Sequence, residues 1–276
     1  MNVKKYIDVS THQGEIDWEK VKSAGIDGVM IRAGYGQGVV DKQFVRNISE
    51  CNRLGIPCGV FWFGYARSVT MAKKEAEYCL AAIKDYKVEL PVAYDYEYES
   101  VNYAKSLGIT ITKAMATAFV HAFCGAVEEA GYYAMNYAGR DFLRSYFDET
   151  TLCYDLWHPW YGNAAEPGVD CGIWQYTSTG SVDGIEGDVD LNYAYKDYAA
   201  LIRRVGLNGL TAEERENEPE PEPATDHKTD YEGVSDYARK SWEKAVAKGI
   251  LDGTNPNGSL LREQAAVVLD RLGLLE

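Results

Sequence analysis

The sequence predicts an α/β protein built on a (β/α) barrel, followed by a small helical module. Two observations predict this organisation. Apolar, β-favouring segments alternate with segments of helical periodicity through residues 1–207, and repeated strand–helix units form parallel sheets. Residues 211–226 then lack apolar periodicity and alternate glutamate with proline, which is typical of an extended, solvated linker. We therefore divide the chain into a barrel (1–207), an acidic linker (208–230) and a module (231–276).

The strands are predicted from short runs rich in β-branched and aromatic residues, several of them alternating. They fall at 5–10, 27–33, 57–65, 89–99, 132–137, 155–161, 172–177 and 188–192. The helices are predicted from helical periodicity, from N-cap residues such as Asp17 and Thr112, and from closing glycines such as Gly55 and Gly131. They fall at 17–24, 41–54, 68–86, 112–131 and 193–205, and in the module at 237–248 and 261–272.

Composition excludes several classes of function. The net charge of −14 argues against nucleic acid and against an anionic membrane surface, because both need a basic footprint. No apolar run approaches the ~20 residues of a bilayer span. The first residues lack the apolar centre of a signal peptide, so we expect the chain to be made as a cytoplasmic protein.

The six cysteines show no Cys-x-x-Cys spacing, so we expect neither a zinc site nor a redox motif. They are Cys51, Cys58, Cys79, Cys124, Cys153 and Cys171. Several have apolar neighbours, which favours buried free thiols. No cofactor is expected.

The segment 89–99 carries the candidate chemistry. It alternates strictly, so that Asp95 and Glu97 point to the same side of a strand, roughly 6–7 Å apart along the chain. Two carboxylates on one face repel each other, and one of them should keep its proton to a higher pH than usual. Acid-assisted cleavage of a glycosidic bond needs this arrangement. The alternative is an exposed edge strand with solvated acids.

Four segments, in this order, resemble the family 25 glycoside hydrolases, which are bacterial and phage muramidases. They are Tyr-Ile-Asp-Val-Ser-Thr-His-Gln-Gly-Glu-Ile-Asp-Trp at 6–18, Ala-Tyr-Asp-Tyr-Glu at 93–97, Leu-Trp and Trp-Tyr-Gly within 156–162, and Ile-Trp-Gln-Tyr-Thr with Gly-Asp-Val-Asp-Leu-Asn within 173–192. The resemblance implies an irregular, TIM-like (β/α) barrel. It also implies an endolysin-type muramidase that hydrolyses the β-1,4 bond between N-acetylmuramic acid and N-acetylglucosamine in peptidoglycan.

The resemblance also implies roles for four acids. Glu97 matches the general acid and Asp95 its carboxylate partner, while Asp8 and Asp190 match two further acids of that site. Asp95 would either orient the substrate's 2-acetamido group, which then attacks C1, or stabilise the oxocarbenium ion directly. Alone, Asp8 and Asp190 would read as turn residues. A divalent cation held by the four acids is the less favoured reading, because no loop has the spacing of Ca²⁺ ligands.

Aromatic residues and one glutamine near the strand ends are candidates for substrate contact. They are Phe61, Trp62, Tyr65, Tyr137, Trp157, Tyr161 and Gln175. Aromatic residues at strand positions are equally compatible with a plain core. Phe-Trp-Phe at 61–63 departs from the Tyr-His-Phe that is common in the family. The functional alternatives are an N-acetylglucosaminidase acting on the same polymer and a non-catalytic glycan-binding barrel.

Residues 231–276 resemble a single S-layer-homology repeat. The matching residues are Trp242, Gly-Ile-Leu-Asp-Gly-Thr at 249–254 and Leu-Arg-Glu-Gln-Ala at 261–265. Such repeats bind cell-wall polysaccharide and usually occur in threes. One repeat has more apolar surface than two short helices can bury, so we expect a homo-oligomer through this module. The expected route is synthesis in the cytoplasm of the host bacterium and action on the cell wall after release.

Overall fold

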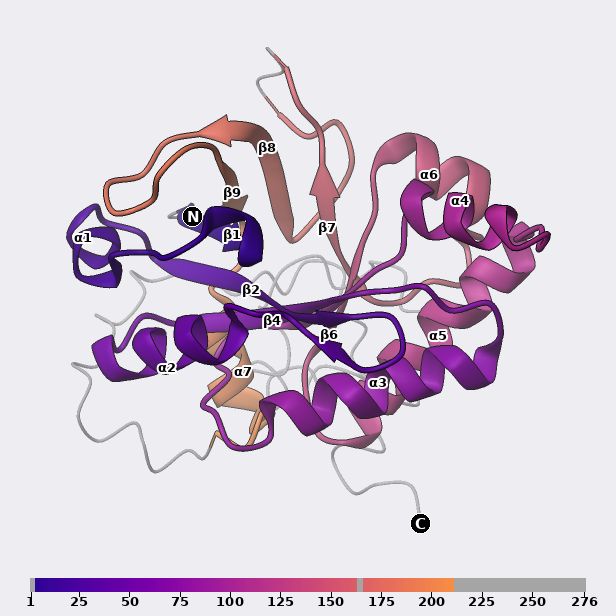
Figure 1. Cartoon of the computed structure of the whole chain (residues 1–276), viewed down its shortest axis with the longest axis horizontal. Coiled ribbons are helices and arrows are strands. Elements are labelled where there is room, and N and C mark those ends of the chain that lie inside the picture. The colour runs from indigo at the N-terminus through magenta and orange to yellow at the C-terminus, as the bar shows by residue number, and fades with distance from the viewer. Residues whose placement is uncertain (1–2, 163–165, 211–276) are drawn as a thin grey trace, which may run out of the picture. The chain divides into compact units, whose positions relative to one another are not determined.

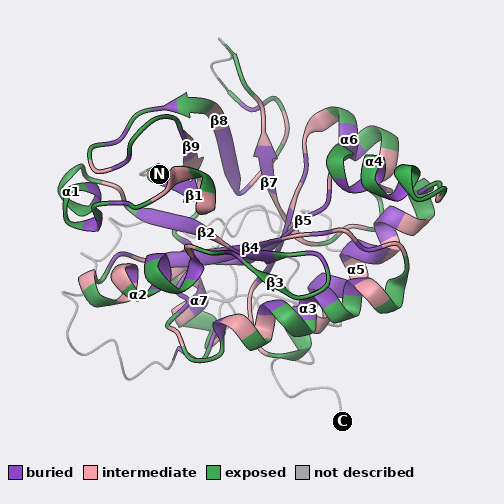
Figure 2. Ribbon diagram, in the orientation of Figure 1, coloured by how far each residue is buried: buried purple, intermediate pink, exposed green. Residues whose placement is uncertain are grey.

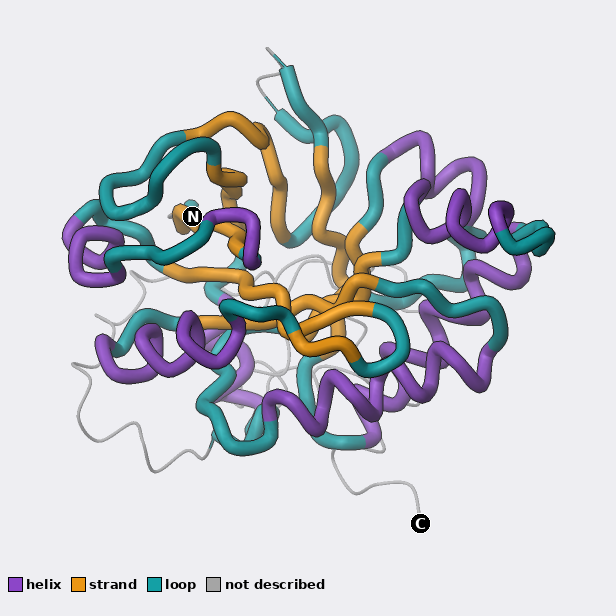
Figure 3. The backbone as a smooth tube through the Cα atoms, viewed as in Figure 1, coloured by secondary structure: helices purple, strands orange, loops and turns teal. Residues whose placement is uncertain are grey.

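The computed structural model describes residues 3–162 and 166–210, and it has strands at its centre with helices around them (Figures 1 and 3). The strands are β1 (Lys4–Val9), β2 (Gly28–Tyr35), β3 (Val39–Val40), β4 (Cys58–Phe63), β5 (Val92–Asp95), β6 (Ala134–Tyr137), β7 (Asp155–Pro159), β8 (Ile173–Gly180) and β9 (Val189–Ala194). The helices are α1 (Trp18–Ser23), α2 (Phe44–Leu54), α3 (Val69–Ile83), α4 (Tyr98–Ser106), α5 (Lys113–Glu129), α6 (Arg140–Tyr146) and α7 (Tyr198–Val205), with a 3₁₀ turn, η1, at Thr11–Gln13.

The strands close into a barrel, as the sequence predicts. Their order is β1-β9-β8-β7-β6-β5-β4-β2, and the pairing of β1 with β2 completes the ring. Short β3 lies outside the ring and pairs only with β2. The expectation of a wholly parallel sheet is wrong at one strand: β9 runs antiparallel to both β8 and β1. No helix separates β8 from β9, so the chain returns directly and must reverse its direction.

Predicted helix ends agree with the structure where a cap defines them. The side chains of Asp17, Ser68 and Thr112 accept backbone N–H groups at the starts of α1, α3 and α5. Gly55 follows α2 with a left-handed φ of 66°, which a glycine adopts without steric cost.

Several elements of the barrel differ from the prediction. Strand β5 ends at Asp95 rather than at 99, because the chain turns there into α4. Helices α4 and α6 were not predicted; both are short and carry aromatic residues, which pack against each other as Tyr98 does on Phe142. Helix α7 begins at Tyr198 rather than at 193, because the preceding residues complete β9.

Two apolar layers hold the barrel together, and burial concentrates on the strands and on the helix faces turned toward them (Figure 2). The larger layer lies between the strands and helices α2, α3 and α5, and includes Ile31, Val60 and Phe123. The smaller layer includes Met30, Phe61, Ala93, Met135 and Trp157. Because neighbouring residues such as Val60 and Phe61 belong to different layers, the strands are buried on both faces.

The described chain continues past the boundary expected at residue 207. The side chain of Asn208 donates to the carbonyl oxygens of Val88 and Leu90, each at 3.0 Å, and accepts the N–H of Tyr133 at 2.8 Å. Leu210 is buried in the smaller apolar layer. The barrel domain therefore reaches at least Leu210. The remaining linker, to residue 230, and the module at 231–276 with its helices at 237–248 and 261–272 lie outside the described residues.

The cysteines agree with the expectation of free thiols. Cys51, Cys58, Cys79 and Cys124 are buried and unpaired in the larger layer or beside it. Across 3–162 and 166–210, no helix combines the length and the apolar character needed to cross a membrane.

Two glycines offer a test of how tightly the barrel is packed. A Cβ atom on Gly59 would lie 2.5 Å from the carbonyl oxygen of Pro91 and 2.8 Å from the sulfur of Met30, so we expect Gly59→Ala to destabilise the fold by about 1–3 kcal/mol. Gly125, within α5, has no atom near that position, so Gly125→Ala should stabilise it by up to about 1 kcal/mol. Denaturant unfolding of both variants measures this, and equal stabilities would contradict the packing described.

Candidate active site

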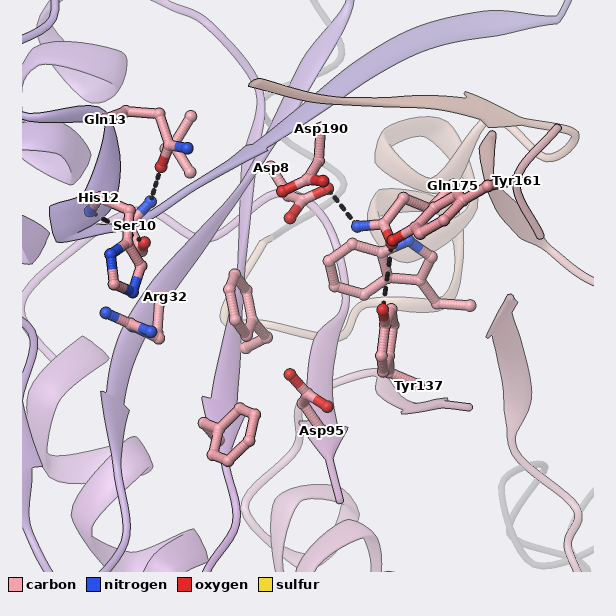
Figure 4. Close-up of a pocket in the computed structure, with 14 residues that line it drawn as sticks. Asp8, Ser10, His12, Gln13, Arg32, Asp95, Tyr137, Tyr161, Gln175 and Asp190 are labelled. Carbon is pink, nitrogen blue, oxygen red and sulfur yellow. Dashed lines mark hydrogen bonds between the residues drawn. The ribbon is translucent and has the colours of Figure 1, made fainter. Parts of the chain in front are cut away.

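A cavity of about 250 Å³ opens where the parallel strands end (Figure 4). Its walls come from nearly every strand of the ring and from η1. The lining residues are Asp8, Val9, Ser10, His12, Gln13, Arg32, Phe61, Phe63, Asp95, Tyr137, Trp157, Tyr161, Gln175 and Asp190. The C-terminal ends of strands in a (β/α) barrel carry the catalytic groups, so this is the candidate active site.

Strand register brings three of the predicted acids to this cavity. Asp95 is the last residue of β5 and stands in register between Phe63 and Tyr137. Asp8 lies near the end of β1 and pairs with Asp190 of β9. Because β9 is antiparallel, its first residues reach the same rim as the last residues of β1. The reversed strand is thus what places Asp190 beside Asp8.

A network of donors orients the Asp8 carboxyl group. Its Oδ2 atom accepts the side-chain amides of Gln175 at 2.9 Å and Asn192 at 2.8 Å. The Gln175 carbonyl oxygen in turn accepts the hydroxyls of Tyr137 and Tyr161 at 3.0 and 2.5 Å. Each amide is therefore held in one orientation, and Asp8 is a fixed group rather than a mobile turn residue.

Asp8 and Asp190 interact as a carboxyl pair. Burial, and then the charge of Asp190, raise the pKa of Asp8 well above its ordinary value. Burial also raises the pKa of Asp190, while a hydrogen bond from Asp8 lowers it. The arrangement favours a proton on Asp8 that is donated to Asp190, since the two residues are directly paired between β1 and β9 and two like charges there would repel each other.

Asp95 is buried and only partly compensated. Burial raises its pKa strongly, the charges of Glu97 and Asp8 raise it further, and the Arg32 guanidinium opposes them. Within the described residues, the Oδ1 atom of Asp95 has no hydrogen-bond partner. A buried acceptor of this kind is costly unless a partner satisfies it, and Asp95 lines the cavity.

Glu97 lies at the N-cap position of α4, directly after the end of β5. Its backbone N–H donates to the Ser100 hydroxyl at 3.1 Å. The side chain is half-buried, and burial raises the pKa of Glu97, with the charge of Glu99 as the second cause. Glu97 does not line the cavity itself. It is close enough to Asp95 for its charge to raise the pKa of the Asp95 carboxyl group.

Arg32 is the main residue that the sequence interpretation missed. Its Nε and one terminal nitrogen both contact the Asp41 carboxylate at 2.8 Å. Asp41 also accepts the backbone N–H groups of Thr11 and Gln43, so the ion pair ties β2 to η1. An arginine within the apolar segment 27–33 was a detectable signal, because a buried charge needs a partner or a function.

The 3₁₀ turn η1 forms a further part of the cavity wall, which the sequence interpretation also missed. Ser10 caps it, and the Gln13 side chain returns to the backbone N–H of Ser10 at 2.9 Å. This closed turn holds His12 at the cavity opposite Tyr161 (Figure 4).

The predicted aromatic contacts divide into two groups. Phe61, Tyr137, Trp157 and Tyr161 line the cavity, and Phe63 joins them. Trp157 is almost fully buried and donates its indole N–H to Asn192 at 2.7 Å, so its main contact is with the network around Asp8.

The prediction for Trp62 is wrong. Its side chain is fully buried in the larger apolar layer, and its indole donates to the carbonyl oxygen of Gly36 at 3.1 Å. Phe61 and Trp62 have opposite parity on β4, so only one of them can face the cavity. Tyr65 lies just outside the cavity lining, with its ring 5.1 Å from that of Phe63.

A metal centre receives no support from the side chains of this part of the chain. Among the described residues, no three His, Cys, Asp or Glu side chains are grouped so that they could hold a metal ion.

Comparison with known proteins places this arrangement in context. Residues 7–185 match the family model described as "Glycosyl hydrolases family 25". The autolytic lysozyme of Clostridium acetobutylicum is 26% identical over 190 residues, covering 68% of this chain and 55% of that protein. Lysozyme M1 of Streptomyces globisporus is 29% identical over 215 residues, covering 71% and 69%.

Solved structures show the same fold. The modular autolysin LytC of Streptococcus pneumoniae, in complex with a synthetic peptidoglycan ligand, superposes with a TM-score of 0.62 at 34% identity, over 70% of this chain and 47% of that one. The bacterial lysozyme of Streptomyces coelicolor superposes with a TM-score of 0.61 at 23% identity, over 75% and 98%. The chain thus spans about half the length of some of its relatives and nearly all of others.

The Asp8 network generates a prediction about stability. The pKa of Asp8 is higher in the folded chain than in the unfolded one, so stability falls as the pH rises above about 4. An asparagine at this position cannot ionise, yet it can accept from Gln175 and Asn192 and donate to Asp190. We expect the melting temperature of Asp8→Asn to match that of the native protein near pH 4 and to exceed it increasingly toward pH 8.

Thermal unfolding across this pH range measures the difference. Asp8→Ala is the matched control, because it leaves both amides without their acceptor and should lower the melting temperature throughout. A loss of stability in Asp8→Asn equal to that of the alanine variant would show that the carboxylate form is the one the fold requires.

Proposed function

This chain belongs to family 25 of the glycosyl hydrolases, and we propose on that premise that its barrel is a muramidase. The substrate is bacterial peptidoglycan, and the bond hydrolysed is the β-1,4 link between N-acetylmuramic acid and N-acetylglucosamine. One observation carries the proposal: Asp95 and Glu97, two carboxyls with raised pKa values, lie together where β5 ends, with Asp95 on the cavity. The peptidoglycan ligand of the related autolysin supports the substrate class.

Glu97 acts as the general acid in this proposal. A general acid must hold its proton at the working pH and release it to the leaving oxygen in the transition state. Burial and the charge of Glu99 both favour the protonated form of Glu97. Its position at the rim, beside the cavity, lets it approach a glycosidic oxygen without being sealed away from solvent.

Asp95 acts at the sugar whose C1 is attacked, and not at the leaving oxygen. Its unpaired, buried Oδ1 atom suits the N–H of a 2-acetamido group. That hydrogen bond would favour the ionised form of Asp95. Because Asp95 and Glu97 titrate as a pair, bound substrate would then leave the shared proton on Glu97, where the reaction needs it. The oriented acetamido group attacks C1, or the Asp95 carboxylate stabilises the oxocarbenium ion directly.

Asp8 and Asp190 complete the negative side of the cavity. Ionised Asp190, with the proton held by Asp8, places one negative charge near the developing positive charge of the sugar. Phe61, Phe63 and Tyr161 offer rings along the wall, and ring faces of this kind pack against the apolar faces of pyranose sugars. Asp8→Asn and Asp190→Asn should therefore lower turnover while the fold is kept.

Mass spectrometry of digested peptidoglycan tests the reaction itself. The proposal requires new reducing ends on muramic acid. Reducing ends on glucosamine would identify an N-acetylglucosaminidase, and the absence of new ends, with glycan still bound, would identify a binding barrel.

The C-terminal region extends the proposal to wall targeting. We propose an endolysin-type enzyme whose residues 231–276 bind cell-wall polysaccharide and assemble into a homo-oligomer, on the resemblance to one S-layer-homology repeat. In this proposal several weak binding sites on one particle act by avidity. Light scattering should show an oligomer for the full chain and a monomer for a variant ending at residue 210; a monomeric full chain at tens of micromolar contradicts this part of the proposal.

The acid assignment makes a direct prediction. Glu97→Gln keeps the shape of the side chain and removes its titrating proton, so lysis of purified walls should fall by at least about 10²-fold. Glu129→Gln makes the same change of charge at the end of α5, which leads into β6 at the opposite end of the barrel, and should leave lysis unchanged. Retention of more than about a tenth of native activity by folded Glu97→Gln would refute the assignment.

A further inference from the structure

Glu75 is a buried carboxylate that the proposed mechanism does not use. It lies on α3 and is fully buried. One oxygen accepts the Tyr94 hydroxyl at 2.6 Å, and the other accepts the Tyr65 backbone N–H at 2.9 Å and the Gln37 side-chain amide at 3.0 Å. Burial raises the pKa of Glu75 and these hydrogen bonds oppose the rise, which leaves the pKa at about 7. Such a group is costly, and all three partners are arranged to satisfy it.

One contact of Glu75, to the backbone N–H of Tyr65, reaches a segment of the cavity rim, residues 64–67, between β4 and α3. At one end of this rim segment, the N–H of Gly64 donates to the carbonyl oxygen of Asp95 at 2.8 Å. At the other end, the carbonyl oxygen of Ala66 accepts the Tyr96 hydroxyl at 3.0 Å. A Cβ atom at position 64 would lie 2.6 Å from the Tyr94 hydroxyl oxygen. The rim segment is therefore seated closely on β5, the strand that carries Asp95.

The rim segment directs the side chain of Tyr65 toward the proposed general acid. The Tyr65 hydroxyl donates to the carboxylate of Glu99 at 2.5 Å. Its ring is 5.1 Å from that of Phe63, on the cavity wall, and 5.0 Å from that of Tyr103 on α4. Glu99 lies in the first turn of α4, two residues after Glu97. The contacts thus run without a break from Glu75, through Tyr65 and Glu99, to the start of the helix that carries the acid.

We propose that Glu75 is a positioning residue for Glu97: it fixes the rim segment so that Tyr65 holds Glu99, and with it the first turn of α4, in place against the cavity. The inference rests on the muramidase function proposed above. Glu75 itself does not meet the substrate in this proposal, since its side chain is fully buried and does not line the cavity.

A purely structural role for Glu75 makes a different prediction. If the carboxylate only satisfied buried donors, loss of any one contact would lower the stability of the fold and would not change kcat. If Glu75 acts through Tyr65, only the contacts on that route affect turnover. Tyr94→Phe is the matched control, because it removes one hydrogen bond from the same carboxylate and leaves the Tyr65 contact and the ring stacking on Phe123.

The experiment compares four variants in steady-state hydrolysis of soluble peptidoglycan fragments. We expect Glu75→Leu and Tyr65→Phe to lower kcat by roughly 10-fold to 100-fold, the scale of a small misplacement of a catalytic group, with little change in KM. Glu75→Gln keeps a carbonyl acceptor for the Tyr65 N–H and should retain at least half of the native kcat. Tyr94→Phe should retain native kcat even where its melting temperature falls. If Glu75→Leu does not fold, Glu75→Asp, whose shorter side chain cannot span both contacts, takes its place.

The dependence of kcat/KM on pH provides a second readout. The charge of Glu99 helps to keep Glu97 protonated, so release of Glu99 lowers the pKa of Glu97. The alkaline limb of the profile should then move to lower pH in Glu75→Leu and Tyr65→Phe, and should not move in Tyr94→Phe.

The outcomes separate this inference from the proposed function. A native protein that cleaves no glycan refutes the muramidase proposal. If the native protein cleaves glycan, either of two results refutes the positioning role alone. In the first, Glu75→Leu and Tyr65→Phe stay within twofold of native kcat. In the second, Tyr94→Phe loses as much kcat as the Glu75→Leu and Tyr65→Phe variants. Reduced kcat and a displaced alkaline limb confined to the Glu75 and Tyr65 variants establish it.

Discussion

The desolvation of several carboxyl groups in and beside one small cavity is the constraint on which the rest of this structure depends. Asp8, Asp95, Glu97 and Asp190 all have raised pKa values, and burial is the first cause in each case. If all four groups were ionised, their like charges would repel each other strongly in this poorly solvated site. Asp8 and Asp95 differ in how the protein satisfies them. Asp8 receives two amide donors and passes a hydrogen bond to Asp190, whereas the Oδ1 atom of Asp95 has no partner among the described residues. The carboxyl group of Asp8 is therefore satisfied by the protein, and that of Asp95 keeps an acceptor at the cavity.

The antiparallel strand that closes the barrel makes the pairing of Asp8 with Asp190 possible. An antiparallel strand inserted between β8 and β1 exposes its first residues at the rim where its parallel neighbours end. Asp190 and Asn192 share one face of that strand, as alternation requires, and both reach Asp8. A regular parallel strand would offer its last residues there instead, at the end of a full helical crossover. The irregularity of this barrel is thus tied directly to the carboxyl pair.

Much of this could be predicted from the sequence, and the failures have identifiable physical causes. Strand and helix positions followed from periodicity and from caps such as Asp17 and Thr112, because these signals are local. Glu97 lies near enough to Asp95 for its charge to raise the pKa of Asp95, although β5 ends at Asp95 and not at 99, and the backbone is again extended at Glu97, the N-cap residue of α4. The reversal of β9 was not recognised, although the short interval after β8 leaves no room for a helix. Trp62 was assigned to the substrate with Phe61 although their parity forbids it. Arg32 was missed because its partner, Asp41, is set by tertiary contact and not by spacing.

The division between strand-borne and loop-borne groups explains how one site can be both rigid and adaptable. Asp8, Asp95 and Gln175 sit on strands, where backbone ladders on two sides fix them. Glu97, Tyr161 and His12 follow strand ends and depend on side-chain contacts, such as the Ser100 hydroxyl or the Gln175 amide. Loop positions on a rigid scaffold can change without loss of the fold. Asp8 and Asp95 therefore lie on the rigid part of the site, while Glu97 and Tyr161 lie on the adaptable part. A buried carboxylate such as Glu75, which reaches from a helix of the scaffold into a rim loop, is where these two parts are coupled.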